Sequence, residues 1–160
     1  MTSSVNYLFD AIRKGDNQYR IEALLKMNPD LVNCKNSDGF TPLIYATYME
    51  NSTFAEIILK YKAEIDMRDA MGNTALMGVC FKGNEIIAKL LLDHGADINA
   101  RNNSGYTALI MAAKYNNVNI MKLLLKYGAD KSIKDEEGNS AYNYAKQNGL
   151  TKMLELFDKK

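Results

Sequence analysis

Four glycines stand 33 residues apart in this chain, at Gly39, Gly72, Gly105 and Gly138. A hydroxyl residue follows each glycine by two positions, and a leucine or tyrosine follows each by four; the pairs are Thr41 with Leu43, Thr74 with Leu76, Thr107 with Leu109, and Ser140 with Tyr142. A third pattern, containing Ala and Asp, recurs in the same register at residues 63–66, 95–99 and 128–132. Three columns with one period predict a tandem array, whose units bury their apolar faces by stacking on one another.

The third full repeat, residues 102–134, shows what one unit is expected to form. It opens with turn chemistry, in which Gly105 supplies a positive φ. Thr107 is predicted to cap the N-terminus of a short helix over residues 108–115, and a two-residue turn then leads to a second helix. Gly128 is predicted to close that second helix in the left-handed conformation. The apolar stripe of the second helix has helical spacing and consists of Ile120, Leu123 and Leu124.

These motifs make the chain similar to the ankyrin repeat family over essentially its whole length. The resemblance rests on DGFTPLIYA at 38–46, on GNTAL at 72–76 with LLLDHGADIN at 90–99, and on GYTAL at 105–109 with LLLKYGAD at 123–130. It implies an all-α fold, an α-solenoid of about five helix pairs joined by β-turn or hairpin loops. The family's usual His after the first Leu is replaced by Ile44, Met77 and Ile110, which affects hydrogen bonding at the helix start more than the fold.

The repeat divides residues 1–160 into units of a single ankyrin-like domain. We expect an N-terminal cap repeat at 4–35, full repeats at 36–68, 69–101 and 102–134, and a C-terminal cap repeat at 135–160, whose last turn carries Lys159 and Lys160. Three full repeats between two atypical ends are expected of a complete short solenoid.

One departure affects stability. Glycines close the later second helices, at Gly95 and Gly128, whereas Lys62 and Asn28 hold the matching positions earlier in the chain. Asn tolerates the left-handed conformation moderately and Lys poorly. Lys62→Gly is therefore predicted to stabilise the fold if the backbone there is left-handed.

Composition disfavours several functional classes. Among 160 residues, 20 Lys plus Arg stand against 19 Asp plus Glu, and a net charge of +1 argues against a dedicated nucleic-acid binder. One His and two Cys leave few ligands for a metal and few nucleophile–base pairs for catalysis. No phosphate-cradling glycine loop or serine-hydrolase motif occurs. We expect no catalysis, cofactor, metal site or small-molecule substrate.

Segments for targeting or membrane insertion are not evident. Residues 1–10 lack the basic start, apolar stretch and cleavage site of a secretory signal. The longest apolar runs, such as residues 108–113, are far shorter than a membrane span. The sequence predicts a cytoplasmic protein without membrane association, and it leaves specialised secretion open.

The residues with chemical potential have ordinary structural interpretations. His94 is expected at the C-terminus of a second helix, where Tyr61 and Tyr127 hold the equivalent positions. Cys80 is expected to be a buried structural thiol, and Cys34 to be more exposed without a charged partner. The acidic triple at 135–137 is expected to be solvated charge at the tip of the final turn.

The resemblance implies that partners bind a concave groove formed by the turn tips and the exposed side of the first helices. Aromatic residues, Met and Arg are the types enriched at binding hot spots. The residues predicted to bind a partner are Phe40, Tyr48, Met49, Arg68, Met71, Phe81, Lys82, Arg101, Tyr106, Lys114 and Tyr115. A basic column with the 33-residue period accompanies them, and it is either a feature of such repeats or part of the site: Lys35, Arg68, Arg101 and Lys134.

The sequence therefore predicts a non-enzymatic protein–protein interaction module, acting as scaffold, adaptor or inhibitor on a protein partner through this groove. One alternative is a host-directed bacterial effector of ankyrin type, and another is a nucleic-acid-associated protein that uses the basic column. A monomer is expected, although exposed repeat ends leave a homodimer open.

Overall fold

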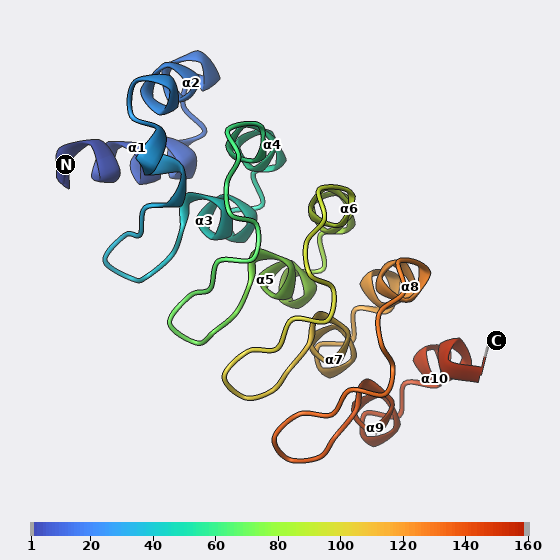
Figure 1. The fold of residues 1–160 in the computed structure, drawn as a ribbon. Coiled ribbons are helices and arrows are strands. Elements are labelled where there is room, and N and C mark those ends of the chain that lie inside the picture. Colours follow the sequence, from blue (N-terminus) through green and yellow to red (C-terminus); the bar gives the residue numbers. More distant parts are fainter. Residues whose placement is uncertain (1, 159–160) are drawn as a thin grey trace.

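The computed structural model describes residues 2–158, which form helices arranged in two rows (Figure 1). The first row contains α1 (Thr2–Lys14), α3 (Pro42–Tyr48), α5 (Ala75–Lys82), α7 (Ala108–Lys114) and α9 (Ala141–Gln147). The second row contains α2 (Gln18–Met27), α4 (Ser52–Lys60), α6 (Glu85–Asp93), α8 (Val118–Lys126) and α10 (Thr151–Asp158), and a 3₁₀ turn, η1 (Pro29–Asn33), follows α2. Lys159 and Lys160 lie outside the described residues.

Each helix packs on the next helix of its row and on the other member of its pair. Long loops run from each second helix to the next first helix and project from the side of the first row (Figure 1). Strand pairing within residues 2–158 is confined to an isolated antiparallel bridge between Lys134 and Ser140. The predicted all-α solenoid of five helix pairs is confirmed. No helix in this part of the chain is long and apolar enough to cross a membrane.

Threonine side chains start the first helices of the three middle pairs, as the sequence predicts for Thr107. The hydroxyl oxygens of Thr41, Thr74 and Thr107 accept the amide three residues later, at 3.2–3.4 Å. The amides belong to the residues that replace the family's His, and their apolar side chains are buried: Ile44, Met77 and Ile110. The replacement therefore adds apolar packing and leaves the helix cap intact.

Each long loop is folded back by an Asn or Asp side chain that the repeat places every 33 residues. Its Oδ1 accepts the amides two and four residues later, at 2.8–3.0 Å, in the loops that begin with Asn36, Asp69, Asn102 and Asp135. The turn glycine between these amides has φ of 76° to 81°, as predicted. The loops are therefore held by local hydrogen bonds and need no sheet.

A second polar column joins successive repeats. Oδ1 of an Asn or Asp accepts a backbone amide of the following repeat at 2.9–3.0 Å; the pairs are Asn33 with Glu64, Asp66 with Asp97, and Asn99 with Asp130. Each of these bonds ties two neighbouring units together, because its donor and its acceptor belong to different repeats.

The core lies between the two rows and consists of Leu, Ile and Ala with the repeat period. Leu43, Leu76 and Leu109 are all at most 2% exposed. The predicted stripe on α8 packs on the core, with Ile120 and Leu124 buried and Leu123 partly buried against it, and Met121 is fully buried as well. Met121 faces inward because both the paired first helix and the neighbouring second helices cover α8, which widens its buried side beyond one narrow stripe.

The ends of the second helices follow the prediction at three of four positions. Gly95, Gly128 and Lys62 have φ of 83°, 85° and 61°, so all three are left-handed. Asn28 does not follow it, because its φ is −137°. The chain there enters η1, whose first residue is Pro29, and a residue before proline is restricted to extended conformations.

Candidate functional site

The loops and the first helices form one side of the solenoid, which we call the loop face (Figure 1). Five of the residues predicted to bind a partner are strongly exposed: Tyr48 (48%), Met49 (37%), Met71 (67%), Phe81 (48%) and Tyr115 (42%). Arg68, Lys82 and Arg101 are exposed as well, whereas Phe40, Tyr106 and Lys114 are half-buried. Exposing large apolar side chains to water is unfavourable, so a group of them on one side of a folded protein indicates an interaction surface.

Phe81 and Tyr115 meet across two repeats. Phe81 lies in the last turn of α5, and Tyr115 is the C-terminal cap of α7. Their ring centroids are 4.6 Å apart with an interplanar angle of 84°, an edge-to-face arrangement. Aromatic pairs of this geometry are favourable beyond the area that they bury. The two rings therefore form one apolar group on the surface, held together by their contact.

Tyr48 forms a second contact across repeats. Phe40 stacks on Tyr48 with centroids 6.0 Å apart, and Lys82 Nζ lies 4.5 Å from the Tyr48 ring centroid. This cation–π contact joins the end of α3 to the end of α5. Since Phe81 and Lys82 are adjacent, the contacts connect Tyr48, Lys82, Phe81 and Tyr115 across three successive repeats.

Tyr106 and Lys114 belong to an internal network of the last repeats. Lys114 Nζ donates to the Tyr106 hydroxyl at 2.7 Å and lies 5.6 Å from the Tyr144 ring centroid. The hydrogen bond to Tyr106 raises the pKa of Lys114. These two side chains contact other residues of the chain and are less available to a partner than Phe81 and Tyr115.

Asp135 corrects the expectation for the acidic triple. Its carboxylate is buried, at 5% exposure, and accepts the Tyr144 hydroxyl at 2.7 Å as well as two loop amides. Burial works to raise the pKa of Asp135, but these hydrogen bonds outweigh it and hold the pKa below the usual value. Burial and the bond to Asp135 also raise the pKa of Tyr144. Only Glu136 and Glu137 are solvated as predicted.

The basic column forms a ladder between the loops. Lys35 Nζ donates to the Arg68 carbonyl at 2.9 Å, Arg68 donates to the Arg101 carbonyl, and Arg101 donates to the Lys134 carbonyl at 3.0 Å. The first three cations of the column therefore each satisfy a carbonyl of the next repeat. The structure assigns the column a role in joining repeats, and partner binding by Arg68 and Arg101 stays a prediction.

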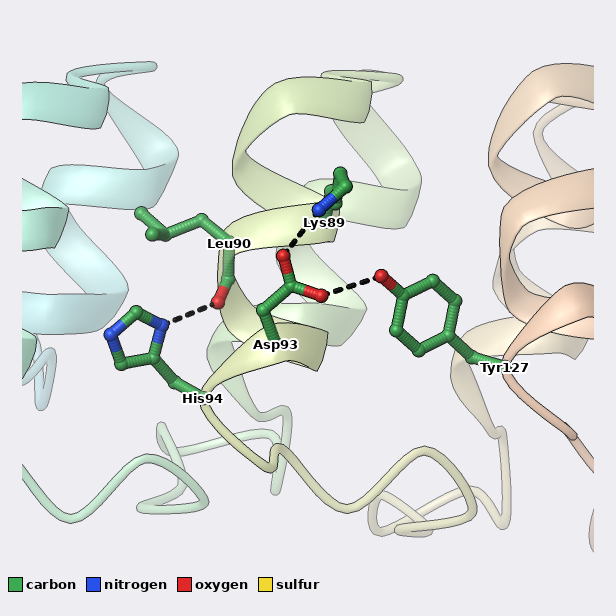
Figure 2. Close-up of polar contacts among 5 residues, drawn as sticks. All are labelled: Lys89, Leu90, Asp93, His94 and Tyr127. Atoms are coloured by element: carbon green, nitrogen blue, oxygen red, sulfur yellow. Dashed lines mark hydrogen bonds and ion pairs between the residues drawn. The ribbon is translucent and has the colours of Figure 1, made fainter.

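His94 and its neighbours form a polar cluster on the second row (Figure 2). His94 is the C-terminal cap of α6, as predicted, with Nδ1 2.8 Å from the Leu90 carbonyl oxygen. Asp93 pairs with Lys89 and accepts the Tyr127 hydroxyl at 2.5 Å, which connects α6 to the cap of α8 (Figure 2). The bonds from Lys89 and then Tyr127 lower the pKa of Asp93, and the bond to Asp93 raises the pKa of Tyr127. Sequence reasoning missed this contact, because the positions equivalent to Asp93 hold Lys60 and Lys126 and only the tyrosine recurs, at Tyr61.

The cysteines have structural surroundings. Cys80 is fully buried, as predicted, and burial raises its pKa far above that of a free thiol. Cys34 is half-buried, and burial raises its pKa as well. Both shifts disfavour the thiolate, the reactive form. Within the described part of the chain, no three His, Cys, Asp or Glu side chains are grouped so that they could hold a metal ion.

Comparison with known proteins identifies the family. A family model of ankyrin repeats (three copies) matches residues 8–102, 54–135 and 99–159, which together cover almost the whole chain. The chain belongs to the ankyrin repeat family. None of the curated proteins matches it. Ankyrin repeats are generally protein–protein interaction modules and are typically non-enzymatic.

Proposed function

We propose that this protein binds a protein partner through its loop face and acts, without catalysis, as a scaffold, adaptor or inhibitor. The observation that carries the proposal is the exposed aromatic group Tyr48, Phe81 and Tyr115. These residues lie in three successive repeats and are linked by the ring contact of Phe81 with Tyr115 and the cation–π contact of Lys82 with Tyr48. Large aromatic side chains supply much contact area at a small entropic cost, and for this reason they dominate binding hot spots. In this proposal the pairs α1–α2 and α9–α10, at the two ends of the stack, serve as its caps.

The nucleic-acid alternative gains no support from the basic column. Arg68 and Arg101 donate to backbone carbonyls of the following repeats, and their separation follows the repeat. Guanidinium groups that satisfy carbonyls have fewer donors to offer phosphates. We therefore favour a protein partner.

The test is the double variant Phe81→Ala with Tyr115→Ala in the full chain. Pull-down from the native cell followed by mass spectrometry should lose the partner, with an affinity loss of at least about 30-fold for two hot-spot side chains. Far-UV circular dichroism should be unchanged, because both side chains lie outside the buried core and at the ends of their helices.

Ile86→Ala is the matched control. Ile86 is a large apolar side chain with 74% exposure on α6, in the second row. Its removal should leave partner recovery unchanged. Equal recovery by the double variant and the wild type would overturn the proposed function.

A further inference from the structure

The charge of the loop face changes sign along the stack. The loop and first helix of the second repeat, residues 68–83, carry two cations and one carboxylate, and residues 101–116 carry two cations and no carboxylate. The outer units have the opposite balance. Residues 35–50 carry one cation and two carboxylates, and residues 134–149 carry two cations and three carboxylates. Between residues 35 and 149 the face is therefore positive in its two middle units and negative in the two flanking units, where the last unit owes its net negative charge to the buried Asp135. Beyond them, α1 carries Arg13 and Lys14 against Asp10 and is net positive.

The chain does not neutralise the positive middle with its own ion pairs. Within the described residues, the ion pairs join side chains of α1, of α2 with α4, and of α6. Asp69, the one carboxylate of the middle units, accepts the amides of Met71 and Asn73 in its own loop. Lys82 instead contacts the Tyr48 ring. A complementary partner gains by placing anions against the middle of the face.

The apolar residues lie in this same stretch. Phe81 and Tyr115 belong to the two positive units, and Met71, with 67% exposure, is in the loop of the first of them. Tyr48 extends the apolar group into the preceding repeat through Lys82. The occupant therefore needs apolar side chains at the spacing of the repeats, with acidic side chains beside them.

Repeat spacing distinguishes a helical occupant from an extended one. The first helices pack side by side, and packed helices have axes about 8–10 Å apart. An α-helix advances about 10.5 Å in seven residues and returns to within about 20° of the same face. A β-strand covers about 10 Å in three residues, but the third residue points to the opposite face. Only the helix presents equivalent side chains to successive repeats.

We propose that the loop face binds an amphipathic α-helix that lies along the stack. Its apolar residues recur about every seven positions, its middle is acidic, and its ends are basic. To reach from Tyr48 to Tyr115 it spans two repeat intervals, so the segment is about 18–21 residues long including its ends. The proposal rests on the proposed function and adds the class of partner and the direction in which it lies.

The first experiment is an unbiased selection. A displayed library of random 20-residue peptides is selected on the full 160-residue chain and depleted on the Phe81→Ala, Tyr115→Ala double variant. We expect enriched peptides with apolar residues spaced by three, four and seven, acidic residues in the middle and no internal proline. Enrichment of proline-containing, extended or basic-centred sequences would overturn the proposal, and so would a failure to enrich any sequence.

The second experiment tests whether affinity depends on the order of charges along the peptide. A fluorescent synthetic helix with Glu in the middle and Lys at both ends is compared with a peptide of the same composition in which these charges are exchanged. The first should bind at least tenfold more tightly in fluorescence anisotropy. Lys82→Glu, an exposed site beside the aromatic group, should reduce that preference at least threefold, while Ile86→Ala should leave it unchanged. Equal affinity of the two peptides would overturn the proposal.

Failure of this inference is separable from failure of the proposed function. If pull-down of the native partner depends on Phe81 and Tyr115 but neither peptide experiment gives the expected pattern, the face binds a protein and the helical, acidic occupant is wrong. If pull-down does not depend on these residues, the proposed function itself is wrong.

Discussion

Lys62→Gly should stabilise the protein, because Lys62 holds a backbone conformation that favours glycine. Its φ is 61°, directly after the C-terminal cap of α4, and its amide donates to the Leu59 carbonyl at 3.0 Å. A residue with Cβ loses about 1–2 kcal/mol in this conformation. Glycine loses about 0.4–1 kcal/mol more conformational entropy on folding. These two contributions differ by about 0–1.6 kcal/mol, and from the middle of that range we expect a net gain in the free energy of unfolding of about 0.5–1 kcal/mol.

Urea and thermal denaturation followed by circular dichroism measure this gain. The melting temperature should rise by about 1–4 °C for a chain of this size. The Lys62 side chain is exposed and makes none of the hydrogen bonds or ion pairs found among the described residues, so little is lost with it. An unchanged or lower melting temperature would refute the reasoning.

Asn28→Gly is the control at the end of α2, where Asn28 is the C-terminal cap. With φ of −137°, Asn28 has no left-handed strain to relieve, and its side chain donates weakly to the Leu24 carbonyl at 3.4 Å. We expect a loss of about 0.4–1 kcal/mol from the added entropy of the unfolded chain. A gain as large as that of Lys62→Gly would show that the left-handed backbone is not the cause.

Two further substitutions test the loops. Gly72→Ala would place a Cβ against the Asn103 side chain and 2.8 Å from the Asn103 amide nitrogen. This substitution should lower the free energy of unfolding by about 2–4 kcal/mol in urea denaturation, because overpacking adds to left-handed strain. The control Gly138→Ala, with similar φ and open space around it, should lower it by about 1–2 kcal/mol. Equal losses would contradict the predicted contact with Asn103. Asp135→Asn should cost about 1–3 kcal/mol at neutral pH. Since the pKa of Asp135 is lowered in the folded protein, its stabilisation is present above the unfolded pKa of about 4 and is lost as pH falls through the lower folded value. The difference between wild type and variant should therefore shrink in acid, and the exposed Glu136→Gln serves as control; a difference that is constant with pH would contradict the assignment.

The repeat predicted most of the fold because its signals act locally. A Thr caps the helix that follows it, a glycine supplies positive φ, and apolar columns identify the packed faces, all within one unit of the sequence. The same signals recur every 33 residues, so one unit of local structure implies the stack. The exposed aromatic residues Tyr48, Phe81 and Tyr115 could be predicted in the same way, since they occupy positions that the repeat pattern places on the solvent-exposed side of the first helices.

Contacts between repeats could not be predicted from the sequence. Asn117 occupies the position of the capping residues Asn51 and Asn84, yet its Nδ2 donates to the Cys80 carbonyl of the preceding repeat at 2.6 Å. The burial of Asp135 likewise depends on Tyr144, nine residues further along, folding back onto its loop.

By itself the sequence determined the period, the helix starts, the left-handed turns and the class of fold, because short-range hydrogen bonds and φ preferences are set by a few neighbouring residues. Only the tertiary structure decided which polar groups meet across repeats, that the basic column bonds to carbonyls, and that Phe81 and Tyr115 form one apolar group. Those pairings depend on the translation and rotation between stacked units. Small changes in that stacking move side-chain atoms by more than the length tolerance of a hydrogen bond.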